Sequence, residues 1–103
     1  MSNKMLSFVN TEKEMPAKRA AEARVGDFAE IYDEFDINTA ETQASRCSQC
    51  GVPFCQINCP LHNNIPDWLM LTAEGRTEEA YRMSAQTNNM PEICGRILSL
   101  IHI

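Results

Sequence analysis

The sequence predicts a small all-α domain that depends on a cysteine-rich loop. Apolar residues recur at helical spacing in several short segments, and no stretch shows the alternation or the hairpin signals typical of β-strands. Four of the five cysteines fall within thirteen positions, from Cys47 to Cys59. A chain of 103 residues has room for one small domain with only a modest core.

The first predicted helix begins at Asp27. Asp27 can cap this helix together with Glu30, three residues further on. One apolar face then follows at positions i, i+3, i+4 and i+7, made by Phe28, Ile31, Tyr32 and Phe35. The preceding residues 1–25 are polar and irregular, which favours a solvated N-terminal arm, with an arm lying on a partner as the alternative.

A second short helix, AETQASRC, is predicted with Thr39 as its cap, and Cys47 lies at its end. The next segment, CSQCGVPFCQINCP, is predicted to be a loop. Gly51, Pro53 and Pro60 all interrupt regular structure there. The cysteines are therefore expected to be presented from irregular backbone.

Two further helices are predicted after the loop. Pro66 suits the first turn of PDWLMLTAEG, which Gly75 ends, and Thr77 can cap EEAYRMSAQ, which stops at Asn88-Asn89 and Pro91. The inward face of the first of these helices is expected to pack against the face of the helix predicted at Asp27. That inward face consists of Trp68, Leu69, Leu71 and Thr72, of which the first three are expected to make the packing contact.

Charge and composition exclude several classes of function. The net charge is −5 and the pI about 4.9, so a nucleic acid is an unsuitable partner. No apolar run reaches the roughly 20 residues that a membrane span needs, and the N-terminus lacks the apolar centre of a signal peptide. We therefore expect a cytoplasmic protein. Five cysteines, an odd number in a reducing compartment, favour metal binding over disulfides.

The cysteine spacing, C-x2-C-x4-C-x3-C-P, favours an iron–sulfur cluster. A zinc-stapled interaction module is the alternative, since compact zinc knuckles have a similar spacing. However, position 55 is Cys where a knuckle has His, and knuckles belong to nucleic-acid-binding proteins, whereas this chain is acidic. The bacterial ferredoxin run also ends in C-P. The apolar residues expected to keep water from a cluster are Val52, Phe54, Ile57 and Leu61.

Together these motifs resemble a known family. The combination R-C-x2-C-G-x-P-x-C, N-C-P-L-H-N-x-I-P-x-W, E-G-R and Q-T-N-x-M-P-E-I-C-G-R closely resembles the N-terminal iron–sulfur domain of glutamate synthase small (beta) subunits. It is similar, more distantly, to the matching domain of dihydropyrimidine dehydrogenase. The resemblance covers roughly residues 5–97 and implies an α-helical ferredoxin-like domain with two [4Fe–4S] clusters.

The resemblance also implies roles for individual cysteines. Cys47, Cys50 and Cys55 correspond to three ligands of one cluster, and Cys59 to a ligand of the other. Cys94 matches a family cysteine that is either a further ligand or a buried structural thiol. His62 is interpreted as an ordinary loop histidine.

The wider function implied is electron transfer within an oxidoreductase. In the family, FAD and NADPH bind a following part, and electrons pass to a large subunit that forms glutamate. Other NAD(P)H-dependent flavin and iron–sulfur oxidoreductases share the domain and remain an alternative. The sequence shows no Gly-rich dinucleotide loop and no nucleophile–base pair, so this chain alone is expected not to be catalytic.

The resemblance stops at Leu98, where the family has its next cysteine. We therefore expect three units: an arm over residues 1–25, an incomplete iron–sulfur domain over 26–97, and a non-native tail over 98–103. Without downstream cysteines, at most one cluster is expected to bind.

Overall fold

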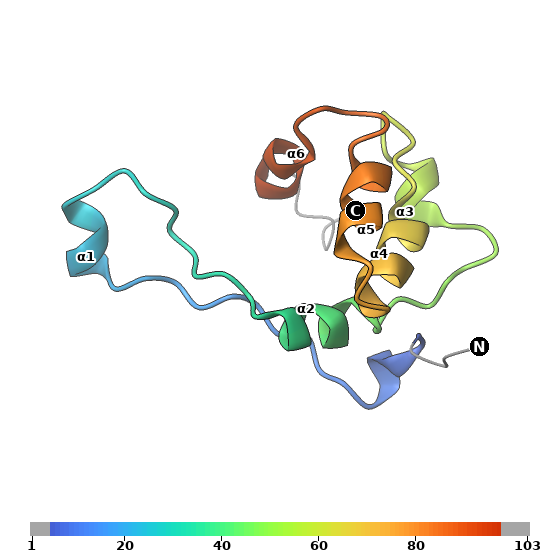
Figure 1. The fold of residues 1–103 in the computed structure, drawn as a ribbon, viewed down its shortest axis with the longest axis horizontal. Coiled ribbons are helices and arrows are strands. Elements are labelled where there is room, and N and C mark those ends of the chain that lie inside the picture. Colours follow the sequence, from blue (N-terminus) through green and yellow to red (C-terminus); the bar gives the residue numbers. More distant parts are fainter. Residues whose placement is uncertain (1–4, 98–103) are drawn as a thin grey trace.

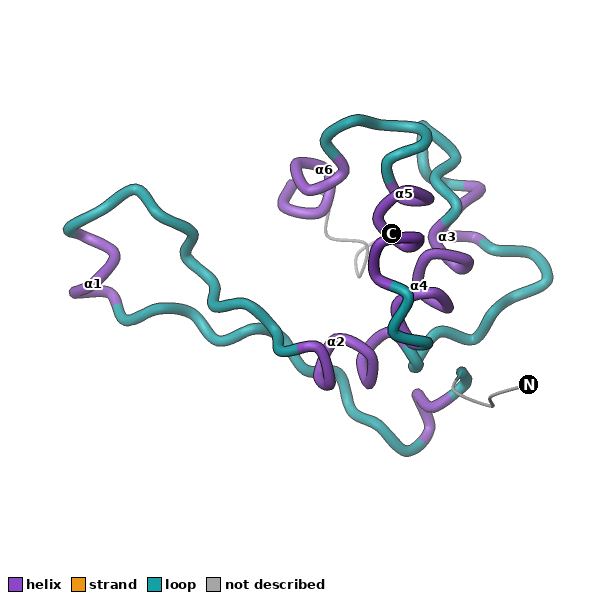
Figure 2. Tube along the Cα trace, in the orientation of Figure 1, coloured by secondary structure: helices purple, strands orange, loops and turns teal. Residues whose placement is uncertain are grey.

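The structure is a computed structural model that describes residues 5–97. In chain order it contains a 3₁₀ turn, η1 (Ser7–Val9), and six helices: α1 (Ala21–Val25), α2 (Ile37–Ala44), α3 (Phe54–Ile57), α4 (Ile65–Ala73), α5 (Thr77–Ser84) and α6 (Pro91–Ile97). Between residues 5 and 97 there is no strand, only one isolated β-bridge, which confirms the all-α class (Figures 1 and 2). No helix in this range has the length and apolar character needed to cross a membrane. The tail expected over 98–103 lies outside the described residues.

Helix α4 is the centre of the domain. It lies beside α5 and also contacts α2 and α3 (Figure 1). The buried apolar side chains all come from α2, α4 and α5 and are mostly small: Ala44, Ile65, Leu71, Ala73 and Ala80. Small side chains let the helices approach closely but bury little apolar area, so this core alone stabilises the domain only modestly.

The turn between α4 and α5 confirms the predicted stop at Gly75. Gly75 has a φ of +80°, a conformation that glycine adopts without strain. Its N–H donates to the carbonyl of Thr72 at 3.0 Å, and the N–H of Arg76 donates to that of Leu71 at 2.9 Å. These two bonds form a Schellman motif, which satisfies the last carbonyls of α4 and reverses the chain into α5.

The helix starts differ from prediction. Helix α2 is capped by Asp36, whose Oδ1 accepts the N–H of Thr39 at 2.8 Å, so Thr39 lies inside the helix. Aspartate is a stronger N-cap than threonine, which accounts for the earlier start. Thr77 is the first residue of α5, after an Arg76 cap with no side-chain bond. Helix α6 was not predicted: Pro91, interpreted as a terminator, begins it, as the fixed φ of proline allows.

The helix predicted from Asp27 is wrong. Residues 27–36 are irregular and return alongside residues 17–19, with the N–H of Arg19 donating to the carbonyl of Ile31 at 2.8 Å. The predicted packing of this segment on Trp68, Leu69 and Leu71 is therefore wrong too, since Phe28 is fully exposed. The apolar spacing is helical, but Phe28 and Ile31 are exposed while Tyr32 and Phe35 are half-buried, so the four side chains do not form one buried face.

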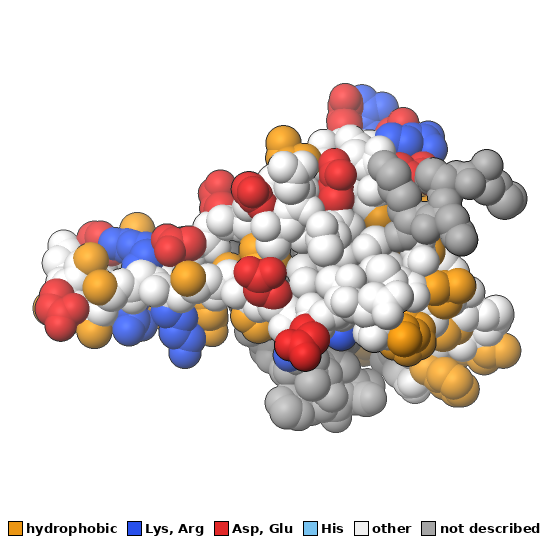
Figure 3. Space-filling model, turned by 90° about the horizontal axis from the view of Figure 1, so that it is seen from below, with side chains coloured by type: hydrophobic (Ala, Val, Ile, Leu, Met, Phe, Trp, Pro, Cys, Tyr) orange, Lys and Arg blue, Asp and Glu red, His pale blue; other side chains and the backbone are white. Residues whose placement is uncertain are grey.

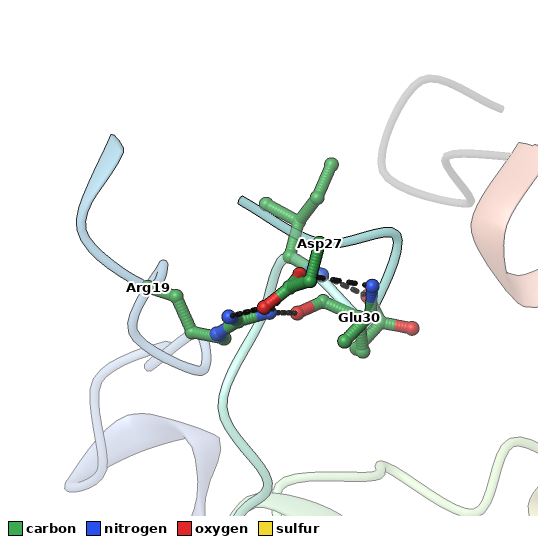
Figure 4. Close-up of polar contacts among 5 residues, drawn as sticks. Arg19, Asp27 and Glu30 are labelled. Carbon is green, nitrogen blue, oxygen red and sulfur yellow. Dashed lines mark hydrogen bonds and ion pairs between the residues drawn. The ribbon is translucent and has the colours of Figure 1, made fainter. Parts of the chain in front are cut away.

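An ion pair replaces the predicted helix cap. Asp27 accepts two hydrogen bonds from the Arg19 guanidinium, at 2.6 and 3.2 Å, and Arg19 also donates to the carbonyl of Glu30 at 2.9 Å (Figure 4). The hydrogen bond from Arg19 lowers the pKa of Asp27. These contacts hold a projecting arm that carries α1 (Figure 1). The radius of gyration, 14.7 Å, accordingly exceeds the roughly 13 Å expected of a compact chain of this length.

Candidate metal centre

The cysteine segment begins just after α2. The N–H of Cys47 donates to the carbonyl of Ala44 at 3.2 Å, and the Cys47 carbonyl accepts the N–H of Leu6 at 3.1 Å. The N–H of Ser7 donates to the carbonyl of Ser45 at 3.0 Å. Leu6 and Ser7, within the predicted arm, are therefore hydrogen-bonded to the start of the cysteine segment.

The prediction of a continuous loop is wrong at one place, where α3 carries Cys55. The carbonyl of Pro53 accepts the N–H groups of Gln56 and Ile57 at 3.1 and 3.0 Å. Proline is tolerated at the start of a helix because the N–H that it lacks would have no partner there. Pro53 can therefore be the N-cap of α3. Cys55 is the second residue of this short helix.

Three thiols are close enough to influence one another. Burial raises the pKa of the Cys55 thiol, and negative charge on Cys47 and Cys50 raises it further. Cys47 is half-buried, whereas Cys50 and Cys55 are more exposed, and all three are free thiols. The Cys55 thiol therefore ionises less readily beside its neighbours, and a bound cation would relieve that repulsion.

The sulfur of Cys47 accepts two hydrogen bonds from Gln49. The backbone N–H of Gln49 lies 3.5 Å from it and the side-chain Nε2 3.4 Å. Gln49 has a φ of +50°, one of the few positive values outside glycine in the described residues. Donors of this kind are the groups that tune iron–sulfur clusters through their ligand sulfurs.

Cys59 lies in the turn that follows α3. Its N–H donates to the carbonyl of Gln56 at 3.2 Å, and its carbonyl accepts the N–H of His62 at 2.9 Å. His62 has a φ of +50° and is exposed, which suits the loop role assigned to it. Cys59 is half-buried and free.

Cys94, in α6, is also a half-buried free thiol. Its sulfur accepts a hydrogen bond of 3.3 Å from Nδ2 of Asn88, whose Oδ1 accepts the N–H of Met90 at 3.1 Å. Asn88 therefore orders the turn before α6, but it does not end the previous helix as predicted, because α5 already ends at Ser84 with Ala85 as its C-cap. From the sequence, Asn88 is interpreted only as a helix stop, and Gln49 is not singled out at all. The sequence hints at the roles of Asn88 and Gln49 only by placing an amide side chain a few residues from a cysteine. Such placements are common in loops and do not single these residues out.

The apolar residues between the cysteines do not enclose them. Their exposed fractions are 59% for Val52, 70% for Phe54, 51% for Ile57 and 46% for Leu61. Hydrophobic side chains gather at the end of the molecule opposite the arm (Figure 3). The expectation that these residues exclude water is not met within this chain.

The donor set fits an iron–sulfur cluster better than a single ion. Among residues 5–97, no group of three or more Cys, His, Asp or Glu side chains converges as a site for one metal ion. In a cubane, each thiolate binds a different iron atom, so ligand sulfurs need not meet at one point. Four free thiols in C-x2-C-x4-C-x3-C order, with N–H donors on one sulfur, suit that chemistry.

Comparison with known proteins supports the same chemistry. Residues 24–100 match the family described as dihydropyrimidine dehydrogenase domain II, 4Fe-4S cluster. The chain is 64% identical over 96 residues to the glutamate synthase [NADPH] small chain of Azospirillum brasilense, an alignment that covers 93% of this chain and 20% of that protein.

Two relatives from Escherichia coli (strain K12) extend the comparison. The glutamate synthase [NADPH] small chain is 44% identical over 97 residues, with 94% of this chain and 21% of that protein covered. The putative oxidoreductase AegA is 47% identical over 83 residues, with 80% of this chain and 13% of that protein covered. The chain thus spans about a fifth or less of the length of these relatives.

Proposed function

Because this chain belongs to the family of dihydropyrimidine dehydrogenase domain II, a 4Fe-4S cluster family, we propose that it is the electron-transfer domain of an NADPH-dependent glutamate synthase small chain. The identity of 64% to one such small chain supports this parent over a more distant oxidoreductase. The cluster-holding part lies within residues 26–97, and the protein works in the cytoplasm, where its thiols stay reduced.

In this proposal the chain passes electrons between protein partners. Electrons from NADPH reach it through FAD, both of which bind other parts of the small chain. They leave toward a large subunit that forms glutamate. The chain itself binds no substrate and carries out no bond-forming step; its residues hold the electron carrier and donate hydrogen bonds to its ligands.

The proposed ligands are those that the family resemblance implies. Cys47, Cys50 and Cys55 hold one [4Fe–4S] cluster, Cys59 contributes to a second, and Cys94 is either a further ligand or a structural thiol. The observation that carries the assignment is the cysteine order C-x2-C-x4-C-x3-C-P within a chain that matches a 4Fe-4S cluster family over residues 24–100. When bound, the cluster supplies one-electron redox chemistry.

Reconstitution under anaerobic conditions tests the proposal. The chain should turn brown and contain iron and acid-labile sulfide in equal amounts. Cys47→Ser, Cys50→Ser or Cys55→Ser should each abolish the cluster that these residues share, because three ligands on one segment bind cooperatively. Full iron content in any of these variants would contradict the ligand assignment. A colourless chain that binds zinc instead would overturn the proposed function.

A further inference from the structure

Gln49 adopts a backbone conformation that its side chain does not favour. Its φ of +50° lies in the left-handed region, where a Cβ is crowded and which glycine and asparagine tolerate best. Such strain persists only where surrounding contacts hold it, and it concentrates at functional sites. The contacts made by Gln49 therefore indicate what the strain achieves.

The side-chain amide of Gln49 uses its donors on two different partners. Nε2 donates to the sulfur of Cys47 at 3.4 Å and to the carbonyl of Pro66 at 2.7 Å. Pro66 is buried in the first turn of α4, the central helix. A single amide thus links the first cysteine of the segment to α4, through a bond to Pro66 that spans seventeen residues from Gln49.

The backbone of Gln49 acts on the same sulfur. Its N–H points to the Cys47 sulfur at 3.5 Å, so two donors from one residue converge on it. The left-handed turn is what brings the N–H and the amide to the same side. A sulfur held by two donors is restricted in direction and is stabilised when it carries more negative charge.

We propose that Gln49 is a positioning residue that orients the Cys47 sulfur and raises the reduction potential of the cluster held by Cys47, Cys50 and Cys55. The inference rests on the proposed function, because it requires a cluster at these cysteines. Reduction adds one electron and increases the negative charge on the ligand sulfurs. Donors on a ligand sulfur therefore stabilise the reduced form more than the oxidised form.

The test compares reduction of the reconstituted chain with that of two variants. Gln49→Met keeps the length of the side chain but removes its donors, and Gln49→Gly removes them while relieving the strain at positive φ. At a fixed potential set with dithionite and mediator dyes, both should show a roughly tenfold lower ratio of reduced to oxidised cluster. For one electron this corresponds to about 59 mV.

Gln56→Met is the matched control. Gln56 lies in the same segment, beside Cys55, and its side chain makes no hydrogen bond to another residue between 5 and 97. This variant should keep both the iron content and the redox ratio of the unaltered chain. If Gln49→Met lowers the reduction potential of the cluster but Gln49→Gly does not, then the backbone conformation at residue 49 determines the potential and the side-chain donor does not. That result would overturn the proposal.

Iron and sulfide analysis separates failure of this inference from failure of the proposed function. If the unaltered chain takes up no cluster, the proposed function is wrong. If it binds a cluster and Gln49→Met matches it in iron content and redox ratio, the function stands and the role of Gln49 is overturned. Loss of the cluster from both Gln49 variants, with helix content retained by circular dichroism and the Gln56→Met cluster intact, supports the positioning role.

Discussion

The indole Nε1 of Trp68 donates a hydrogen bond of 2.9 Å to Oδ1 of Asn63. Nδ2 of Asn63 in turn donates to the carbonyl of Ser84 at 2.7 Å and to Oγ1 of Thr87 at 3.0 Å. Asn63 follows Cys59 by four residues, so this one amide joins the end of the cysteine segment to α4 and to the end of α5. Trp68 is half-buried, and its polar end is satisfied by this bond, as expected for tryptophan.

Asn63→Ala should destabilise the domain by about 2 kcal/mol, because it leaves a tryptophan N–H, a carbonyl and a hydroxyl without their partner. For a domain of this size, each kcal/mol lowers Tm by roughly 4–8 °C. Thermal unfolding followed by circular dichroism measures the change. The control is Asn89→Ala, an exposed asparagine after α5. Equal Tm values for the two variants would show that the Asn63 bonds contribute nothing.

Gly75→Ala should cost about 1–2 kcal/mol, because a Cβ at φ +80° is strained. The added Cβ would also lie 3.0 Å from Oε1 of Glu41, a flexible side-chain end that can move aside, so backbone strain dominates. Gly51→Ala is the matched control, since nothing lies within 4 Å of its added Cβ. That variant should change the stability by less than about 1 kcal/mol. Denaturant unfolding compares them, and an unchanged Gly75→Ala midpoint would refute the strain argument.

The exposed position of Phe28 predicts that Phe28→Ala changes the free energy of unfolding by less than about 0.5 kcal/mol. Leu71→Ala, at a site only 6% exposed, should instead cost about 2–4 kcal/mol. Urea unfolding of both variants separates the two sites. A large loss of stability in Phe28→Ala would mean that residues 27–36 are packed, as the apolar spacing first predicted.

Stability should fall in acid through the cap at Asp36. Hydrogen bonding from Thr39 lowers the pKa of Asp36 below its ordinary value of 3.8. A carboxylate with a lowered folded pKa stabilises the fold fully above its unfolded pKa, and that contribution disappears as the pH falls through the folded pKa. The Tm difference between the unaltered chain and Asp36→Ala should therefore be constant near neutral pH and shrink below about pH 4.

Melts at a series of pH values check this, with Glu34→Ala as the control. Glu34 is exposed and caps no helix. A loss of the same size and pH dependence in Glu34→Ala would contradict the role given to the cap.

Much of the helical framework could be predicted because its signals are local. Pro66 lies in the first turn of α4 and Gly75 directly follows its end, as predicted, since both act through the φ angles that each residue allows. The spacing of the cysteines likewise indicated a metal cluster, because ligand chemistry is set by residue type and order. The family match over residues 24–100 agrees with that chemistry.

The remaining features depend on partners distant in sequence. Periodicity predicted a helix at Asp27, but only the fold shows that Arg19 binds Asp27 and that no surface lies opposite Phe28. The position of the Gln49 amide between Cys47 and Pro66 was equally beyond sequence reasoning, since it requires α4 to lie against the cysteine segment. Sequence by itself determined the chemistry and the local helix signals. Tertiary structure alone decided which side chains meet, because a contact exists only when both of its surfaces are in place.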